Sequence, residues 1–128
     1  MDKQHIINTS KAPRAIGTYS QAISIKNFIF TSGQIPIVKE TNELISAEFS
    51  EQAVQTLKNL DNLIESAGSN RNKIIKLSVY LTDLNNFESL NKTFNNFFKK
   101  DTYPARTVIE VSKIPKDSQI AIEAICYI

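Results

Sequence analysis

Residues 119–128 constrain the fold most, because they predict a β-strand that is apolar on both faces. Alternate side chains of a strand point to opposite faces of its sheet, and here both sets are mostly apolar. Two helices of the same chain can cover only one face of a small sheet, so the second face needs apolar surface from elsewhere. We expect a homo-oligomer whose sheets face one another, with coverage by the chain's own loops as the alternative. One face holds Ile120, Ile122, Ala124, Cys126 and Ile128, and the other holds Ala121, Ile125 and Tyr127.

Hydrophobic periodicity predicts two helices and four further strands before this segment. Residues 74–81 alternate, which places Ile75 and three later apolar side chains on one face. A helical period recurs twice, after Ser50 and again after Asn86. The predicted class is α+β with the order ββαβαββ, a single sheet with two helices on one face. The strands are expected at residues 22–25, 28–32, 74–81, 107–111 and 119–128, and the helices at residues 50–67 and 87–98.

Polar residues at the boundaries predict how some of these elements begin and end. Ser50 is a good N-cap for the first helix, and Gly68 ends that helix. Lys26 and Asn27 predict a two-residue hairpin turn in which Asn27 takes the positive φ.

Composition narrows the class of protein. With 128 residues, 41% of them hydrophobic, the sequence predicts one folded domain over residues 1–128. No run approaches the roughly 18–20 apolar residues of a membrane span, and the first residues lack the apolar segment of a secretion signal. We therefore expect a cytoplasmic protein. The net charge of +2 is spread along the chain, without the basic patch typical of a nucleic-acid partner.

The chain has few residues for metal or nucleophilic chemistry. Cys126 is the only cysteine, so it forms no internal disulfide and no CxxC motif. His5 is the only histidine, and a histidine in a polar N-terminal segment is usually just solvated. We expect no metal site, and chemistry carried by carboxylates, Arg, Lys, Tyr, hydroxyls and backbone groups.

Arg106 is the most informative single residue. The chain contains twelve Lys and three Arg, so an arginine here indicates a need for its planar fork, which binds a carboxylate through two parallel hydrogen bonds. Pro104 precedes it, and a predicted strand follows it. The alternative is a surface ion pair with a nearby Glu.

Two short segments are further candidates for ligand contact. Residues 31–36 combine the end of a strand with Ser32 and Gly33, and a glycine lets backbone approach a ligand. Residues 16–21 contain Tyr19, whose phenol either meets a ligand or covers the core. By itself, the segment at residues 31–36 is more often a plain strand-to-loop corner without a function, and a tyrosine that leads into a hairpin more often covers the core.

Seven segments, in order, carry a family resemblance. They are IGTYSQA, FTSGQIP, a helix that ends in AG, SVYLTDLNNFESLN, YPAR, IPKD and IEAI. Together they resemble the RidA (YjgF) family of enamine and imine deaminases, from about Ile7 to Tyr127. The resemblance implies a chorismate-mutase-like fold and a homotrimer, with ligand sites between neighbouring subunits, which agrees with the two-faced last strand.

The resemblance also implies a reaction. It is the hydrolysis of reactive 2-imino acids and their enamine tautomers, such as 2-iminopropanoate and 2-iminobutanoate, to 2-oxo acids and ammonia. No cofactor is expected, because a protonated imine is already electrophilic and needs only a carboxylate anchor, an oriented water and hydrogen bonds. The expected partner is a small acid, with no membrane and no nucleic acid. The alternatives are a non-catalytic trimer that binds 2-oxo or 2-imino acids and, last, an endoribonuclease or translation inhibitor.

The resemblance assigns site residues one by one. Arg106 matches the family's carboxylate-binding arginine, and the backbone of Val108 matches a group that meets the substrate. Thr107 and Val108 stand where the family usually has Ser and Cys, so the thiol is absent although its backbone role can survive. Thr18 replaces a common proline. The remaining pocket positions fall on Tyr19, Ser32, Gly33, Phe87 and Asn91.

One difference from the family pattern affects the activation of water. The family's water-orienting carboxylate falls on Ala121 in this chain. Losing a positioned acid or base costs about 10²- to 10⁴-fold in rate. Glu123 lies on the same face, about 7 Å further along an extended strand, and is expected to act through a second water. Its alternative role is that of a structural ion-pair partner or hydrogen-bond acceptor at the subunit interface.

Overall fold

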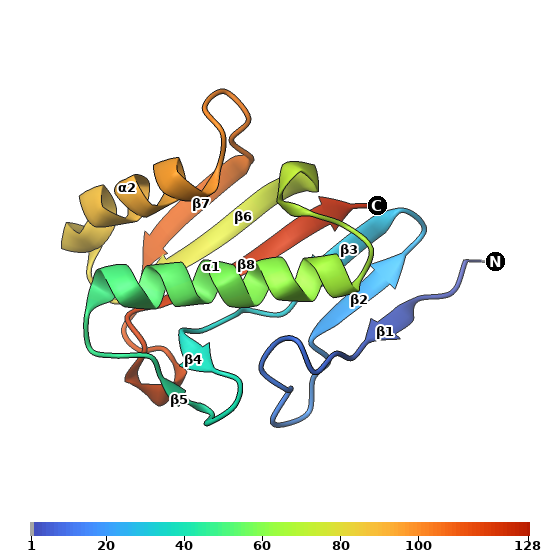
Figure 1. Cartoon of the computed structure of the whole chain (residues 1–128), viewed down its shortest axis with the longest axis horizontal. Helices are drawn as coiled ribbons and strands as arrows, with labels where there is room; N and C mark the ends of the chain where they lie inside the picture. The colour runs from blue at the N-terminus through green and yellow to red at the C-terminus, as the bar shows by residue number, and fades with distance from the viewer. Residues whose placement is uncertain (1) are drawn as a thin grey trace.

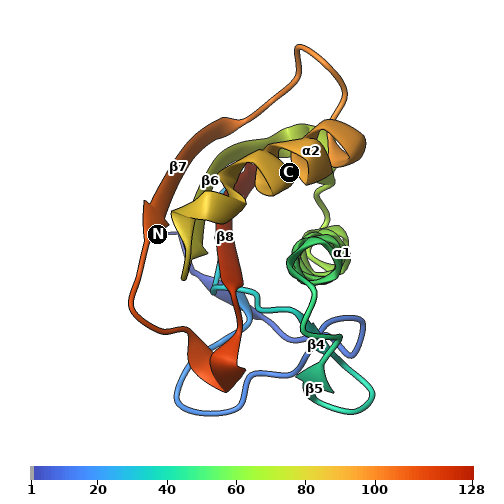
Figure 2. The ribbon, with the colours of Figure 1, turned by 90° about the vertical axis from the view of Figure 1, so that its left-hand side faces the viewer.

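A six-stranded sheet carries two helices on one of its faces (Figures 1 and 2). The structure, a computed structural model, describes residues 2–128. The strand order is β1-β2-β3-β8-β6-β7, in which β6 and β7 are parallel and all other neighbours are antiparallel. The strands are β1 (His5–Ile7), β2 (Ala22–Ile25), β3 (Phe28–Thr31), β6 (Ile74–Leu81), β7 (Ala105–Glu110) and β8 (Ile120–Tyr127), and the helices are α1 (Phe49–Ser66) and α2 (Phe87–Phe97).

The α+β class and the ββαβαββ order are confirmed. Three short elements add to them: strand β1 at the sheet edge, and a small separate hairpin of β4 (Ile37–Val38) and β5 (Glu43–Leu44). Each is two or three residues long, which is too short to produce a periodic pattern. Strand β7 begins at Ala105 rather than at residue 107, so Arg106 lies inside the strand.

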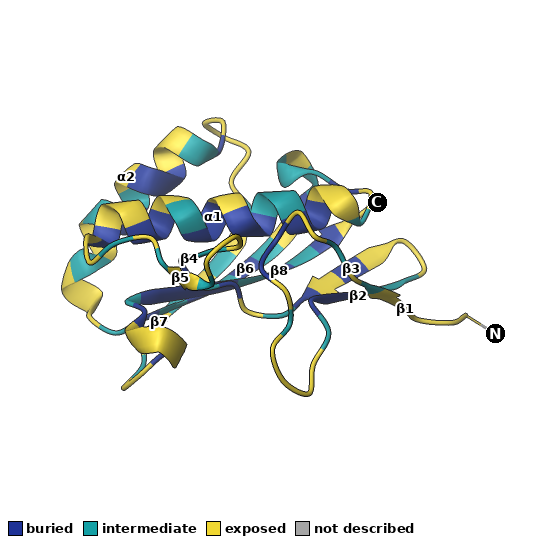
Figure 3. Cartoon of the chain, turned by 60° about the horizontal axis from the view of Figure 1, so that its bottom comes forward, coloured by how far each residue is buried: buried dark blue, intermediate teal, exposed yellow. Residues whose placement is uncertain are grey.

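The core lies between the helices and the inner face of the sheet. Figure 3 shows α1 alternating between buried and exposed positions, as expected for an amphipathic helix. Leu57, Leu60 and Ile64 of α1 are fully buried against Leu77 and Ile122 of the sheet. Each such side chain contributes roughly 1.5–3 kcal/mol by leaving water.

The ends of α1 differ in part from the prediction. The helix begins at Phe49, and Glu48 occupies the N-cap position without a side-chain cap bond, so Ser50 is not the cap. Phe49 is itself buried in the core, which draws it into the first turn. Gly68 ends the helix as predicted, with a φ of +95°.

Two local predictions about strands were wrong. Lys26, not Asn27, has the positive φ of 52°, while the Asn27 carbonyl accepts a hydrogen bond from the Ile128 N–H at 2.9 Å. A bulge between Ile74 and Lys76 shifts the alternation of β6, so Ile74 is buried and Ile75 is exposed.

The outer face of the sheet is rich in exposed apolar side chains. Phe28, Phe30, Ile109 and Tyr127 remain 43–46% exposed, so the chain's own loops do not cover them. Ile128, placed by the sequence on the inner face, lies beyond the end of β8 and is also exposed. The apolar outer face predicted from residues 119–128 is therefore present and uncovered in a single chain.

Candidate functional site

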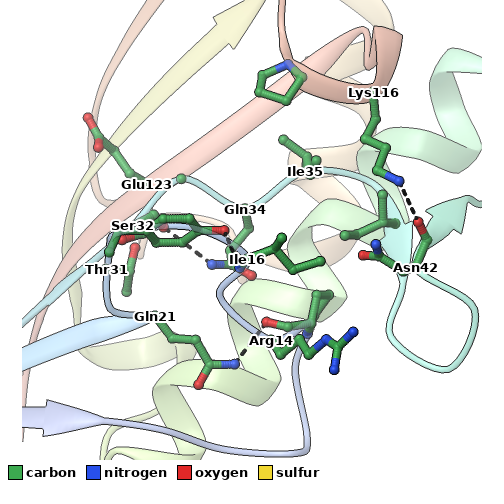
Figure 4. Close-up of a pocket in the computed structure, with 15 residues that line it drawn as sticks. Arg14, Ile16, Gln21, Thr31, Ser32, Gln34, Ile35, Asn42, Lys116 and Glu123 are labelled. Carbon is green, nitrogen blue, oxygen red and sulfur yellow. Dashed lines mark hydrogen bonds between the residues drawn. The ribbon is translucent and has the colours of Figure 1, made fainter.

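A cavity of about 730 Å³ lies where β3 ends, beside the N-terminal loop (Figure 4). Its walls include Tyr19, Ser32, Gly33 and Glu123, four of the residues singled out in the sequence. Figure 4 shows Glu123 at one edge of the cavity, with Arg14 and Lys116 on the opposite side.

Gln21 holds the N-terminal loop against this cavity. Its side chain is buried, accepts a hydrogen bond from the Thr9 N–H at 2.7 Å, and donates to the carbonyls of Thr9 at 3.1 Å and Pro13 at 2.8 Å. A buried amide must satisfy its polar atoms, so these bonds fix the loop. The sequence reasoning missed this residue; its only signal was a glutamine within the IGTYSQA segment.

Tyr19 is a cavity residue and does not cover the core. Its side chain is 53% exposed, and its hydroxyl accepts a hydrogen bond from the Ile16 N–H at 3.3 Å. Gly17 makes this arrangement possible, since its φ of +124° lies in a region that residues with a side chain rarely adopt.

Ser32 and Gly33 present a fixed backbone to the cavity. The Ser32 hydroxyl donates to the Ser20 carbonyl at 2.5 Å, and the Ser32 N–H donates to the Gln21 carbonyl at 2.9 Å. On the other side, Gln34 exchanges two backbone hydrogen bonds with Ile122 of β8. A Cβ at Gly33 would meet nothing within 4 Å, so the glycine leaves open space between two anchored residues.

Glu123 accepts a hydrogen bond on the outer face of the sheet. The Tyr80 hydroxyl donates to its Oε1 at 2.6 Å. This bond, together with burial and the charge of Glu123, raises the pKa of Tyr80 above its usual value. Glu123 is therefore a hydrogen-bond acceptor for Tyr80 and at the same time a wall of the cavity.

Arg106 belongs to a second group, beside α2. Its Nη1 donates to Asn91 Oδ1 at 2.8 Å, and its guanidinium carbon lies 5.4 Å from the Phe87 ring centre and 5.0 Å from that of Phe94. Burial lowers the pKa of Arg106 from its usual value, yet a guanidinium remains charged. No salt bridge among residues 2–128 includes Arg106, so the predicted alternative of an ion pair with Glu is wrong.

This second group opens into its own hollow of about 420 Å³, bounded by Asn91, Phe94 and Tyr103 as well as Arg106. Val108 lies two residues further along β7 and packs its side chain against the core. Because β7 is an edge strand, it presents unpaired backbone groups to any neighbour.

The two groups lie apart in one chain. The paired residues Phe30, Ile125, Lys76 and Ala105 cross the sheet from β3 to β7 in three steps, or about 14 Å. Tyr19, Ser32, Gly33 and Glu123 therefore cluster near β3, whereas Phe87, Asn91 and Arg106 cluster at β7. A molecule of four or five carbon atoms does not span both clusters within a single chain.

Comparisons with known proteins identify the family. The model of the family described as Endoribonuclease L-PSP matches residues 9–128. A RutC family protein of Pyrococcus abyssi is 44% identical over 97% of both chains. TdcF of Escherichia coli, provisionally named a reactive intermediate deaminase, is 42% identical over 94% of both chains.

Solved structures agree with this result. TdcF with bound serine superposes with a TM-score of 0.91, at 39% identity over 97% of both chains. The Rid family protein YyfA of Yersinia pestis, whose function is unknown, gives a TM-score of 0.95 at 38% identity, over 98% of this chain and 100% of that one. The chain belongs to the RidA family, which the family model describes as Endoribonuclease L-PSP.

Two features are absent from the part of the chain that the structure describes. Within residues 2–128, no helix is long and apolar enough to span a bilayer. The same residues form no cluster of three or more His, Cys, Asp or Glu side chains suited to a metal ion.

Proposed function

We propose that this protein hydrolyses small aliphatic 2-imino acids, such as 2-iminobutanoate and 2-iminopropanoate, to 2-oxo acids and ammonia. The observation that carries the proposal is the environment of Arg106. Its guanidinium is held by Asn91 between two aromatic rings and has no carboxylate partner among residues 2–128. A partly buried fork of this kind fits the carboxylate of a small acid.

The names and ligands of related proteins support a small acid as the substrate. TdcF carries the name of a reactive intermediate deaminase, and its crystal structure contains serine, a three-carbon acid. By analogy, this chain anchors the carboxylate of a ligand of similar size.

The reaction balances without a cofactor. Water adds its oxygen to C2 of the protonated imine, and one proton passes to a base, which leaves a neutral carbinolamine. That proton returns to nitrogen, the C–N bond breaks, and the hydroxyl proton leaves as the carbonyl forms. The products are the 2-oxo acid and ammonium. A fixed donor near C2, here the Gly33 N–H, stabilises the tetrahedral carbon and its oxygen.

The complete site is proposed to form between neighbouring subunits of a homotrimer. Two features support this: the uncovered apolar outer face, and the separation of the Arg106 group from the Ser32 group. A second copy of the chain would cover the apolar outer face and would bring its own Arg106 group to the Ser32 group of the first. In this arrangement Arg106 and Asn91 of one subunit face Tyr19, Ser32 and Glu123 of the next.

One observation favours a second candidate, a trimer that binds 2-oxo or 2-imino acids without turnover. Ala121 places a methyl group where the family resemblance implies the carboxylate that orients water. The anchor at Arg106 does not depend on residue 121, so binding survives even if turnover is lost.

Decay of 2-iminobutanoate tests both candidates. Threonine dehydratase generates the imine in the presence of semicarbazide, which traps what is not hydrolysed. We expect the protein to suppress trapping, Arg106→Ala to abolish this effect, and Arg106→Lys, which keeps the charge but not the fork, to restore little of it. If the protein does not accelerate the decay of 2-iminobutanoate but still binds 2-oxobutanoate, the deaminase proposal is wrong and the binding trimer is supported.

A further inference from the structure

Tyr80, Glu123 and Ala121 form one unit on the outer face of the sheet. In the β6–β8 pairing, Tyr80 lies directly opposite Ala121, and Ser78 lies opposite Glu123. The Tyr80 hydroxyl therefore reaches diagonally to Glu123 Oε1, at 2.6 Å. That length is typical of a hydroxyl donating to a carboxylate.

The direction of this bond leaves one oxygen of Glu123 free. The pKa of Tyr80 is raised, first by the hydrogen bond to Glu123, so the phenol keeps its proton and donates it. Oε1 accepts from Tyr80, and among residues 2–128 no side chain or backbone group donates to Oε2. Figure 4 shows the Glu123 side chain at the edge of the cavity and directed away from Gln34. The strand register places it on the outer face with Tyr80.

Ala121 provides space beside this carboxylate. It lies two residues before Glu123 on the same face, about 7 Å away, and is only 9% exposed. This length separates the Cα atoms, and because a methyl group is the smallest side chain with a Cβ, residue 121 leaves more room for a water hydrogen-bonded to Oε2 than any larger side chain would.

We infer that Tyr80 is a positioning residue that fixes Glu123 so that the carboxylate, through one water over Ala121, acts as the base for imine hydrolysis. This inference rests on the proposed function and assigns the base within the same site. Glu123 takes one proton from the attacking water through the relay water as the C–O bond forms. It returns that proton to nitrogen before the C–N bond breaks. Tyr80 does not touch the substrate and keeps its own proton throughout.

The Tyr80→Phe variant tests this inference, because it removes one hydroxyl and preserves the ring. We expect kcat/KM for 2-iminobutanoate to fall about 10-fold or more, and Glu123→Gln to lower it further, toward the 10²-fold typical of a lost base. The dissociation constant of 2-oxobutanoate should stay within about twofold, since Arg106 and not Tyr80 anchors the ligand. In the Glu123→Gln background, Tyr80→Phe should cause no further loss, because it acts only through Glu123. Ser50→Ala, which removes an exposed hydroxyl on α1 away from the cavity and the outer face, is the control and should leave the rate unchanged.

A space-filling variant gives an independent test. Ala121→Val leaves Tyr80 and Glu123 in place but occupies the position of the relay water, so the rate should fall about as far as in Glu123→Gln.

Five results would overturn the inference. One is an active wild-type protein together with a Tyr80→Phe variant of unchanged kcat/KM. Another is a double variant of Tyr80 and Glu123 in which the two losses of kcat/KM add up. A Tyr80→Phe variant that loses ligand binding and assembly together would show a structural role, and an unaffected Ala121→Val variant would exclude the relay water. A wild-type protein without activity would end the proposed function and this inference together.

Discussion

Asn91 accepts a hydrogen bond from Arg106 at 2.8 Å and thereby uses one of the five N–H donors of the guanidinium. The other donors remain available for a carboxylate. The bond also sets the angle of the fork, because Asn91 sits on α2, which packs its buried Leu90 and Phe94 into the core.

Removing this support should weaken ligand binding. In Asn91→Ala the guanidinium keeps its charge but loses its fixed direction, so the dissociation constant of 2-oxobutanoate should rise about tenfold, the effect of one lost hydrogen bond to a charged group. Isothermal titration calorimetry measures this constant. Asn96→Ala, an exposed position on the same helix, is the control. Equal affinities for wild type and Asn91→Ala would show that Asn91 does not orient the anchor.

A charge on the outer face of the sheet should prevent assembly. Phe30 is exposed on that face in a single chain, and covering a carboxylate there without a partner costs several kcal/mol. We expect Phe30→Glu to sediment as a monomer in analytical ultracentrifugation and to lose imine hydrolysis, because each site then lacks half of its residues. Val54→Glu, at an exposed apolar position on α1, should remain assembled. A trimeric Phe30→Glu variant would place the interface elsewhere.

Gly33, which lines the cavity, and Gly17, which lies beside Tyr19, should respond differently to alanine. Gly17→Ala forces a φ of +124° onto a residue with a side chain. Its free energy of unfolding should fall by about 1–2 kcal/mol, as measured by urea denaturation. Gly33→Ala meets open space, so its stability should stay within about 0.5 kcal/mol of wild type while ligand affinity drops. The reverse pattern would contradict the structural roles assigned here.

Cys126 should be chemically inert in the folded protein. Burial raises the pKa of its thiol to about 12, so almost no thiolate exists at pH 8. A chromogenic disulfide reagent at pH 8 should react only after urea is added. Rapid labelling of the folded protein would mean that β8 opens readily.

The same thiol should lower the free energy of unfolding as the pH rises above about 9. Its folded pKa lies above its unfolded one, so the folded chain retains a proton that the unfolded chain loses above about pH 9. This contribution is complete below pH 9 and declines between there and pH 12. Cys126→Ala should show a smaller loss of unfolding free energy over that interval. Identical slopes for the two proteins would refute the assignment.

The fold was largely predictable because its main elements have clear periods. Strand β6 occupies the predicted residues 74–81, since alternation over eight residues is unambiguous. The bulge at Ile75 was not predictable, because it depends on how β6 pairs with β8. The positive φ of Lys26 likewise follows from the bond between Asn27 and Ile128, a contact that local sequence does not encode.

The site was predictable residue by residue but not as an arrangement. Scarce arginine use singled out Arg106, the segment at residues 16–21 offered Tyr19, and the family resemblance added Phe87 and Asn91. Gln21 was missed because its three bonds exist only once the N-terminal loop has closed. Tyr80 was missed because its partner lies 43 residues further along the chain, and only the strand register brings the two together.

Strand β8 follows every other helix and strand in residues 2–128, yet it lies in the middle of the sheet, between β3 and β6. During synthesis, the hairpin of β2 and β3 and the β6–β7 pair therefore leave the ribosome as two halves with no strand to join them. Their apolar edges stay unpaired until residues 120–127 emerge, so the sheet closes only after almost all of these residues have been made. A translation product that stops before Ile120 lacks the joining strand and exposes two unpaired strand edges. Such edges can pair with other chains, so we expect this product to be bound by chaperones or degraded by proteases.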